Sequence, residues 1–346
     1  MSKQRYPSID CIKGLACIAV VIIHYNISGG SIPPEIGLAM KTVCRFAVPV
    51  FFCISGFFLS ASGEIDKRKT SRKALHILKL LLGSALFYAC FTCLLQYAGN
   101  LHWSPVAYFK ERVTVTKAVK FLLTHDPFAY SHLWFLIALV YCYWFVALFL
   151  NNSNRRIIYW LTPLCFAAFN LMQEFRLLPA SLEVSGLTSR IYFYNSFLFR
   201  ALPAFLSGMI LRDRLDRIAA LKISNAVLYA LALFGCGLSL VERKVFFETQ
   251  FYLGSYLTWI CLMLWALRNP DSGNRILVHV GRDLSMYVYI LHIAVGKTVD
   301  FLGGKLHFQG HTPYYLVRPF AVLILSLAVS ECVFRAKQYA AGKAGK

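Results

Sequence analysis

Long apolar runs separated by short polar segments dominate this chain. A membrane-spanning helix needs about 20 mostly apolar residues, and somewhat fewer where neighbouring helices shield polar ends. The runs predict ten spans, near residues 10–28, 43–60, 75–98, 132–150, 157–172, 196–211, 224–241, 247–267, 284–302 and 314–334. The pattern predicts an all-α polytopic membrane bundle that forms one integral-membrane domain over residues 1–346.

Composition supports this fold class. The chain has 346 residues, of which 58% are hydrophobic, and its mean hydropathy is +0.56. These values are too apolar for a soluble domain of this size. The first apolar run carries Lys13 and His24 and is followed by many more runs, so we interpret it as a span and not as a signal peptide.

The positive charge of the chain is best explained by membrane orientation. The formal net charge is +20, and many of the cations lie in loops between apolar runs. With the amino terminus inside, the inner segments 67–73, 155–156, 212–222 and 268–282 and the carboxyl-terminal tail are rich in Lys and Arg. The positive-inside rule then places both termini in the cytoplasm. No zinc-finger or RNA-binding motif is present, so we expect no nucleic-acid partner.

The eleven cysteines do not indicate metal or redox chemistry. Cys90 and Cys93 form a C-x-x-C pair, but this pair lies inside a predicted helix and has no second pair. We interpret the cysteines as small packing residues and expect no metal site.

The first span contains the strongest candidate for chemistry. Lys13 and His24 are eleven residues apart, which on a helix corresponds to about three turns plus ~20° and a rise of ~16 Å. Both side chains therefore share one face, and His24 lies deep in an apolar segment. Ionisable groups in lipid mark functional sites by default, although a histidine can also serve as a hydrogen-bonded packing residue.

Two further predicted spans contain polar or conformationally special residues. In the second span, Pro49 can kink the helix, and the small pair Ser55-Gly56 allows another helix to approach closely. At the start of the fourth span, His132 and Trp134 either anchor the helix in the interfacial aromatic belt or contact substrate.

Two charged or titratable residues lie inside later spans. Arg200 lies about one turn inside the sixth span, where a carboxylate or a bound anion would be needed to hold it. His292 lies within the ninth span, either as a site residue or as a hydrogen-bond donor between helices.

Two polar segments have alternative interpretations. The run 67–73 contains Arg68, Lys69 and Arg72; it is either a solvated inner loop or a binding site for a ligand with several phosphates, which arginine grips well. Within the outer segment 99–131, residues 113–123 predict a short interfacial helix, with a lid as the alternative. Residues 173–195 are expected to form a polar loop.

Four ordered motifs give the chain a resemblance to the membrane-bound acyltransferase-3 family of bacterial O-acyltransferases. A basic residue, ten others and a histidine match at Lys13 to His24, and V-P-x-F-F-x-x-S-G matches at Val48 to Gly56. H-L-W-F-L matches at His132 to Leu136, and S-x-x-x-Y-x-x-H matches at Ser285 to His292. The ordered set is more specific than any one motif.

The chain departs from the family pattern at two places. Many members carry arginine where Lys13 stands, and a lysine attracts an anion without gripping it bidentately. The paired-arginine element R-x-x-R is approximated here by Lys69-Thr-Ser-Arg72. We expect a stand-alone member without a soluble domain after the last span.

The resemblance implies a multi-pass enzyme of the bacterial inner membrane. Its donor would be cytoplasmic acyl-CoA, usually acetyl-CoA, with no tightly bound cofactor, and its acceptor a hydroxyl of a carbohydrate or glycolipid. His24 would be the general base, with a transient acyl-histidine as the variant, and Lys13 would lie near the donor entrance. We expect the substrate-binding residues to be Ser55, Arg68, Lys69, Arg72, His132, Trp134, Arg200 and His292.

The main rival function is a membrane transporter or flippase, because many spans with buried His and Arg also suit translocation. Against it, the chain lacks a repeated pair of Gly/Pro-broken spans in two matching halves. The side of the membrane on which transfer occurs stays open, as does the acceptor, and no sequence signal indicates an oligomeric state.

Overall fold

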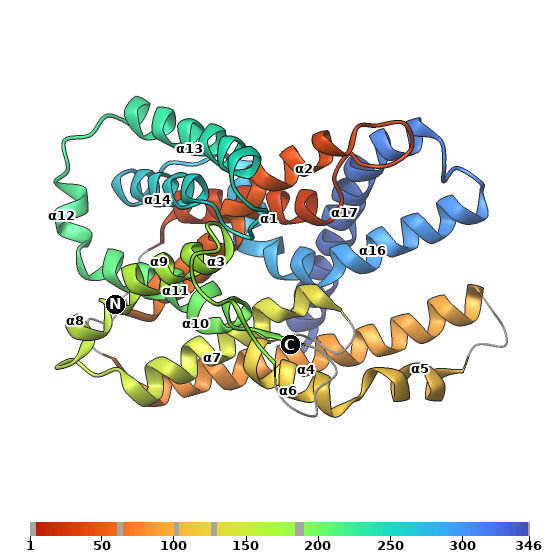
Figure 1. Cartoon of the computed structure of the whole chain (residues 1–346), viewed down its shortest axis with the longest axis horizontal. Coiled ribbons are helices and arrows are strands. Elements are labelled where there is room, and N and C mark those ends of the chain that lie inside the picture. Colours follow the sequence, from red (N-terminus) through yellow and green to blue (C-terminus); the bar gives the residue numbers. More distant parts are fainter. Residues whose placement is uncertain (1–4, 61–64, 100–103, 126–129, 184–189, 345–346) are drawn as a thin grey trace. The chain divides into compact units, whose positions relative to one another are not determined.

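The computed structural model describes residues 5–60, 65–99, 104–125, 130–183 and 190–344 (Figure 1). The chain forms two compact units. Unit 1 comprises residues 1–51, 215–245 and 250–346, and unit 2 comprises residues 52–214 and 246–249.

The regular elements of unit 1 are helices joined by loops, and the unit combines segments from both ends of the chain. Its elements are α1 (Pro7–His24), α2 (Pro34–Val43), the 3₁₀ turn Cys44–Phe46, α12 (Leu215–Ala219), α13 (Asn225–Val245), α14 (Leu253–Arg268), α15 (Arg275–His279), the π-helical turn Val280–Leu284, α16 (Ser285–Lys305) and α17 (Thr312–Ala344). Helix α1 packs against α14, α15, α16 and α17, so residues from both ends of the chain form the surroundings of α1.

Unit 2 is mostly helical. Helix α3 (Ala47–Leu59) runs into it, followed by α4 (Lys67–Gly99), α5 (Pro105–Arg112), α6 (Val115–Thr124), the 3₁₀ turn Ser131–Leu133, α7 (Trp134–Phe149), α8 (Arg155–Ile158), α9 (Leu161–Gln173), strands β1 (Ser181–Leu182) and β2 (Ile191–Tyr192), the 3₁₀ turn Phe193–Asn195, α10 (Phe197–Arg200) and α11 (Leu202–Asp213). The strands pair antiparallel within the segment expected to be a polar loop.

The helices confirm an all-α membrane protein. Among the described residues, six helical stretches are long and apolar enough to cross a membrane: Pro7–His24, Pro34–Leu59, Lys67–Gly99, Ser131–Phe149, Asn225–Val245 and Thr312–Gly342. The other four predicted spans contain α9, α11, α14 and α16, of which α14 is a shorter apolar helix. The number of spans therefore remains a prediction.

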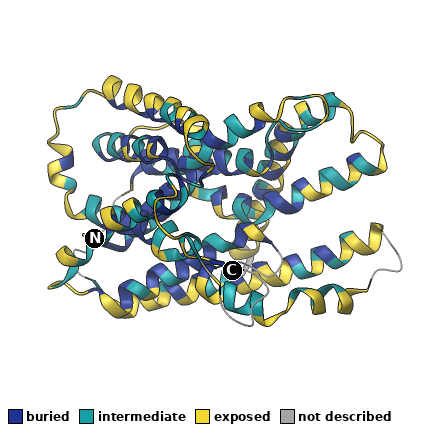
Figure 2. Ribbon diagram, viewed as in Figure 1, coloured by how far each residue is buried: buried dark blue, intermediate teal, exposed yellow. Residues whose placement is uncertain are grey.

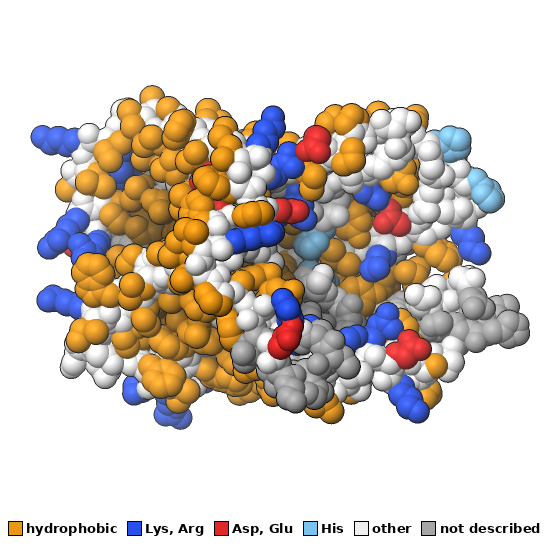
Figure 3. Space-filling model, viewed as in Figure 1, with side chains coloured by type: hydrophobic (Ala, Val, Ile, Leu, Met, Phe, Trp, Pro, Cys, Tyr) orange, Lys and Arg blue, Asp and Glu red, His pale blue; other side chains and the backbone are white. Residues whose placement is uncertain are grey.

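Apolar side chains cover the exposed faces of the long helices, as expected of surfaces that contact lipid. On α4, Leu82, Leu86 and Leu94 are each more than 60% exposed. Much of α13 and α4 is exposed in Figure 2, and hydrophobic side chains cover much of the surface visible in Figure 3. Exposed apolar surface on this scale is normal only where lipid replaces water.

Small residues allow α3 and α11 to pack backbone to backbone. A Cβ on Gly56 would overlap the carbonyl oxygen of Phe205, and a Cβ on Gly208 would overlap that of Cys53. This confirms the close helix approach predicted at Ser55-Gly56. Pro49, which lacks an N–H, lies in the first turn of α3 directly after the 3₁₀ turn, so the predicted irregularity is also present.

The predicted sixth span is broken. Helix α10 ends at Arg200 and α11 begins at Leu202, with Pro203 in its first turn. Proline is well tolerated at a helix start but not inside a helix, which explains the break. A helix, α6, is present where a short interfacial helix was predicted, and its position at the membrane surface stays a prediction. Thr114 caps its amino terminus by accepting from the Lys117 N–H.

Candidate active site

His24 and His292 lie side by side in unit 1. Their ring centroids are 5.2 Å apart with an interplanar angle of 48°. His292 is fully buried, and its Nδ1 lies 2.9 Å from the Val288 carbonyl oxygen. Because a carbonyl only accepts, Nδ1 carries the proton and Nε2 has the lone pair. His24, the last residue of α1, is exposed. One histidine is therefore accessible to a reactant, and the other is fixed beside it.

Contacts of Tyr25 determine the position of His24. The Tyr25 hydroxyl donates to the carbonyl oxygen of Ile293 at 3.2 Å, and the Tyr25 N–H bonds to Val21, which ends α1. A Cβ on Gly296 would overlap the Tyr25 ring, so only glycine admits this ring against α16. The carboxyl end of α1 is thus held against the helix that carries His292.

The other end of α1 is held by a pair of glycines. A Cβ on Gly14 would overlap the Leu277 carbonyl oxygen, and a Cβ on Gly281 would overlap that of Asp10. Gly281 belongs to the π-helical turn, a type of irregularity that is frequent at functional sites. The two glycines bring α1 against α15 and this turn at the level of Lys13.

Lys13 lies in an acidic environment. The acidic groups that interact electrostatically with it are Asp10 and Asp283. A lysine beside carboxylates attracts a further anion less strongly than an isolated lysine does. Lys13 and His24 are both on α1, as the eleven-residue spacing predicted, with a rise of ~16 Å between them.

His279 joins three elements at the Lys13 end of unit 1. Its Nδ1 lies 2.8 Å from an oxygen of Asp283, and its Nε2 lies 2.8 Å from an oxygen of Glu331 on α17. Only the imidazolium form donates from both nitrogens. The hydrogen bonds to Glu331 and Asp283 accordingly raise the pKa of His279 above its ordinary value.

We expect this histidine to make the stability of the protein depend on pH. Because the folded-state pKa is raised, the stabilisation is fully present below the ordinary value of about 6.5 and is lost as the pH rises through the folded-state pKa. The melting temperature of the detergent-solubilised protein should therefore fall between pH 6 and pH 9 by more than that of the His279→Gln variant. Parallel pH profiles for the two proteins would contradict this.

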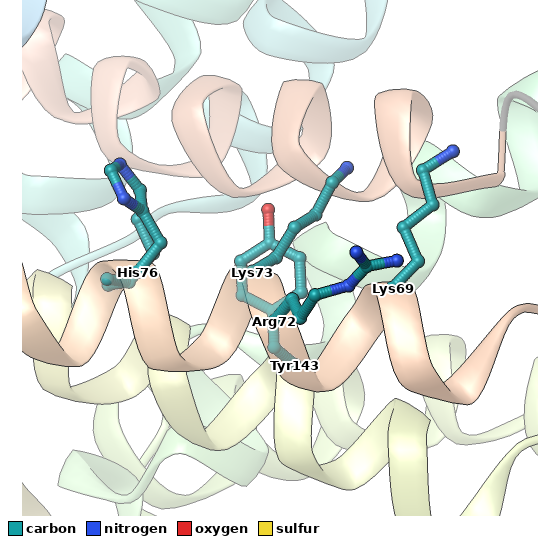
Figure 4. A pocket seen from close by; sticks show the side chains of 6 residues that line it. Lys69, Arg72, Lys73, His76 and Tyr143 are labelled. Atoms are coloured by element: carbon teal, nitrogen blue, oxygen red, sulfur yellow. The ribbon is translucent and has the colours of Figure 1, made fainter.

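A basic pocket lies on α4 in unit 2. It has a volume of about 440 Å³ and is lined by Lys69, Arg72, Lys73, His76, Ile77 and Tyr143. Figure 4 shows that the four basic side chains project from one face of α4, beside the Tyr143 ring of α7. No carboxylate is among these lining residues, and the volume lies in the range typical of small-molecule sites.

The pocket brings together three of the predicted substrate-binding residues and adds others. Lys69 and Arg72 line it, and Ser55 on α3 hydrogen-bonds to the side chain of Tyr143. Arg68 is exposed and is not part of the lining. Lys73 ends the run 67–73 in which a phosphate site was predicted, whereas His76 and Tyr143 were not predicted. Positions 69, 72, 73 and 76 follow the spacing of one helical face.

Trp134 and Arg200 form a second cluster in unit 2. The Arg200 guanidinium lies 3.6 Å from the centroid of the Trp134 ring, and its Nη1 donates to the Asn195 side chain at 3.4 Å. An aromatic face and an amide thus contact the arginine for which a carboxylate or an anion was expected. His132 is buried, with its ring 4.9 Å from that of Tyr88.

One of the comparisons with known proteins identifies a family. A family model described as an acyltransferase domain matches residues 6–333, which is nearly the whole chain. No curated protein and no solved structure matches significantly. The match includes α1 with Lys13 and His24, the basic face of α4 and α16 with His292. The chain therefore belongs to the acyltransferase-3 family of multi-pass membrane acyltransferases.

Proposed function

We propose that the protein is an O-acetyltransferase of the bacterial inner membrane. It transfers the acetyl group of cytoplasmic acetyl-CoA to a hydroxyl of a cell-envelope carbohydrate or glycolipid. The observation that carries this proposal is the accessible His24 ring beside the buried His292, within a chain that matches the acyltransferase model over residues 6–333.

His24 acts as the general base in this reaction. Its neutral imidazole takes the proton from the acceptor hydroxyl, and the oxygen attacks the carbonyl carbon of the thioester. The tetrahedral intermediate collapses with cleavage of the C–S bond, and the coenzyme A thiolate takes the proton from the His24 imidazolium. His292 fixes the position of His24 through ring contact. Direct transfer is favoured over an acyl-histidine, because an acylated His24 could no longer take the proton of the acceptor hydroxyl and a second base would be needed.

The basic pocket on α4 binds the phosphates of the donor. Coenzyme A is polyanionic, and Lys69, Arg72, Lys73 and His76 supply positive charge and hydrogen-bond donors from one helix face. Arginine pairs with phosphate oxygens through two parallel hydrogen bonds, whereas lysine acts as a point charge. Arg72 is therefore the main phosphate ligand.

The proposal is tested with isolated membranes and acetyl-CoA labelled in the acetyl group. Membranes that contain the protein should transfer label into envelope material as esters that mild alkali releases. Mass spectrometry of surface glycans from cells with and without the protein then identifies the acetylated sugar. Equal labelling with and without the protein would refute the proposal, and glycan movement without consumption of acetyl-CoA would indicate a transporter or flippase.

A further inference from the structure

Arg318 on α17 is held only loosely within unit 1. Its Nη1 lies 3.6 Å from a carboxylate oxygen of Asp300, and its Nη2 lies 3.5 Å from the Asn26 carbonyl oxygen. Its buried Nε has no hydrogen-bond partner among the described residues. Charge-assisted hydrogen bonds normally measure about 2.7–2.9 Å. The guanidinium therefore retains hydrogen-bonding capacity although its side chain is only 15% exposed.

Asp300 lies too far from Arg318 for a strong charge-assisted hydrogen bond, and it accepts a shorter one from another side chain. The Tyr314 hydroxyl donates to the same Asp300 oxygen at 2.7 Å. The Asp300 side chain is also 34% exposed, so solvent screens its charge. A ligand anion can therefore approach Arg318 without displacing a strong ion pair.

Two aromatic rings flank the guanidinium. The centroid of the Tyr25 ring is 5.8 Å and that of the Tyr315 ring is 5.4 Å from the Arg318 guanidinium carbon. Pro319, inside α17, lacks the N–H that would bond to the Tyr315 carbonyl. The first two turns of α17 thus present an aromatic ring, a cation with a hydrogen-bond donor that is not used, and the carbonyl oxygen of Tyr315.

This cluster lies on the same side of unit 1 as His24. Tyr25 directly follows His24, and Arg318 contacts Asn26, the next residue. On α16, Asp300 is eight residues beyond His292, which corresponds to a rise of about 12 Å. An acceptor whose hydroxyl meets His24 would have its more distant groups at Arg318.

The surrounding charge favours an anion. Segments 24–46, 296–304 and 311–320 together contain four cations, Lys41, Arg45, Lys297 and Arg318, and two acids, Glu35 and Asp300. Glu35 is paired with Arg243 at 3.0 Å. Lys41 is the cation that interacts electrostatically with His24 itself. Positive charge therefore exceeds negative charge from the histidine pair to Arg318.

We propose that Arg318 binds an anionic group of the acceptor, a carboxylate or a phosphate, with Tyr25 and Tyr315 against its apolar surface. The acceptor is thus an acidic carbohydrate or glycolipid. This inference rests on the proposed function and identifies the class of substrate.

The first test compares variants in membranes of the source organism that lack the native copy. Label from acetyl-CoA is followed into envelope material for the wild type, Arg318→Gln, Arg318→Lys and the matched control Lys305→Gln. Arg318→Gln should lower transfer at least tenfold without changing the KM for acetyl-CoA, and Arg318→Lys should retain part of the activity. Lys305→Gln should behave as wild type. Equal rates for Arg318→Gln and Lys305→Gln would overturn the proposal.

The second test uses purified protein and simple probes, and it remains informative if a variant is inactive. Melting temperatures are measured with glucuronate, inorganic phosphate or glucose at constant ionic strength. At least one anion should stabilise the wild type more than Arg318→Gln, and glucose should stabilise neither. The glucuronate and phosphate arms distinguish a sugar carboxylate from a phosphate. Equal anion effects on both proteins would overturn the proposal.

Failure of this inference can be distinguished from failure of the proposed function. If His24→Ala abolishes labelling and Arg318→Gln does not, acyl transfer stands and the acidic acceptor is refuted. If His24→Ala retains full labelling, His24 is not the general base, whatever the activity of Arg318→Gln.

Discussion

Replacing His24 with alanine is expected to lower acyl transfer by about 10² to 10⁴-fold, the usual contribution of a general base. Alanine removes the imidazole nitrogen that takes the acceptor proton in the proposed reaction. Because His24 is exposed, the change leaves no internal cavity, and the protein should reach the membrane in normal amounts. Transfer from labelled acetyl-CoA, corrected for protein amount, measures the effect.

Two variants make this result specific. His24→Gln keeps the size and polarity of the side chain but cannot serve as a base near neutral pH, so it should be as inactive as the alanine variant. His307→Ala, at the exposed end of unit 1 beyond α16, should retain full activity. Activity of His24→Gln near the wild-type rate would show that His24 only packs or hydrogen-bonds.

The second large effect is expected at the basic pocket. Arg72→Ala removes a charge-assisted bidentate contact with phosphate, worth about 1.5–3 kcal/mol. The KM for acetyl-CoA should therefore rise about 10- to 100-fold. The value of kcat should change little, because the contact is made equally in the ground state and the transition state.

Controls on both the protein and the donor distinguish the pocket from general surface charge. Arg68→Ala removes the same charge from the same turn of α4 but lies outside the pocket lining, so its KM should stay near wild type. With S-acetylpantetheine, which lacks the nucleotide and its phosphates, Arg72→Ala and wild type should perform equally. Two results would contradict a phosphate site: an equal rise in KM for Arg68→Ala, or an equal loss of activity by Arg72→Ala when S-acetylpantetheine is the donor. The basic face of α4 would then serve only to orient the helix in the membrane.

Apolar runs and small residues predicted much of the fold. Span-length hydrophobicity is a local property, so the helices around Lys13, Ser55 and His132 could be located without tertiary information. The close helix approach at Gly56 was also predictable, because few other reasons exist for a serine-glycine pair inside an apolar helix. The break after Arg200 was missed, since Pro203 starts a helix as readily as it ends one.

The arrangement of the candidate sites depends on tertiary contacts that a sequence does not show. Arg200 was expected to have a charged partner, but the ring of a tryptophan 66 residues away contacts it instead. An aromatic ring carries no charge, so the sequence offers no complementary residue that would identify this contact. Arg318 lies near the start of α17, and the sequence does not distinguish it from other cations at helix ends. Its loose contacts with Asp300 and Asn26 become visible only when α1, α16 and α17 are assembled.

The contacts of α1 have a consequence for how the protein is made. Gly14 packs on Leu277, and the Ser8 hydroxyl bonds to the Ala266 carbonyl, partners that are encoded more than 250 residues later. At a synthesis rate of about 5–20 residues per second, α1 waits on the order of 15 to 50 s in the bilayer before they emerge. During this time its glycine and serine face has no native partner. The helix that carries His24 is thus completed only after α14 and α15 have been made.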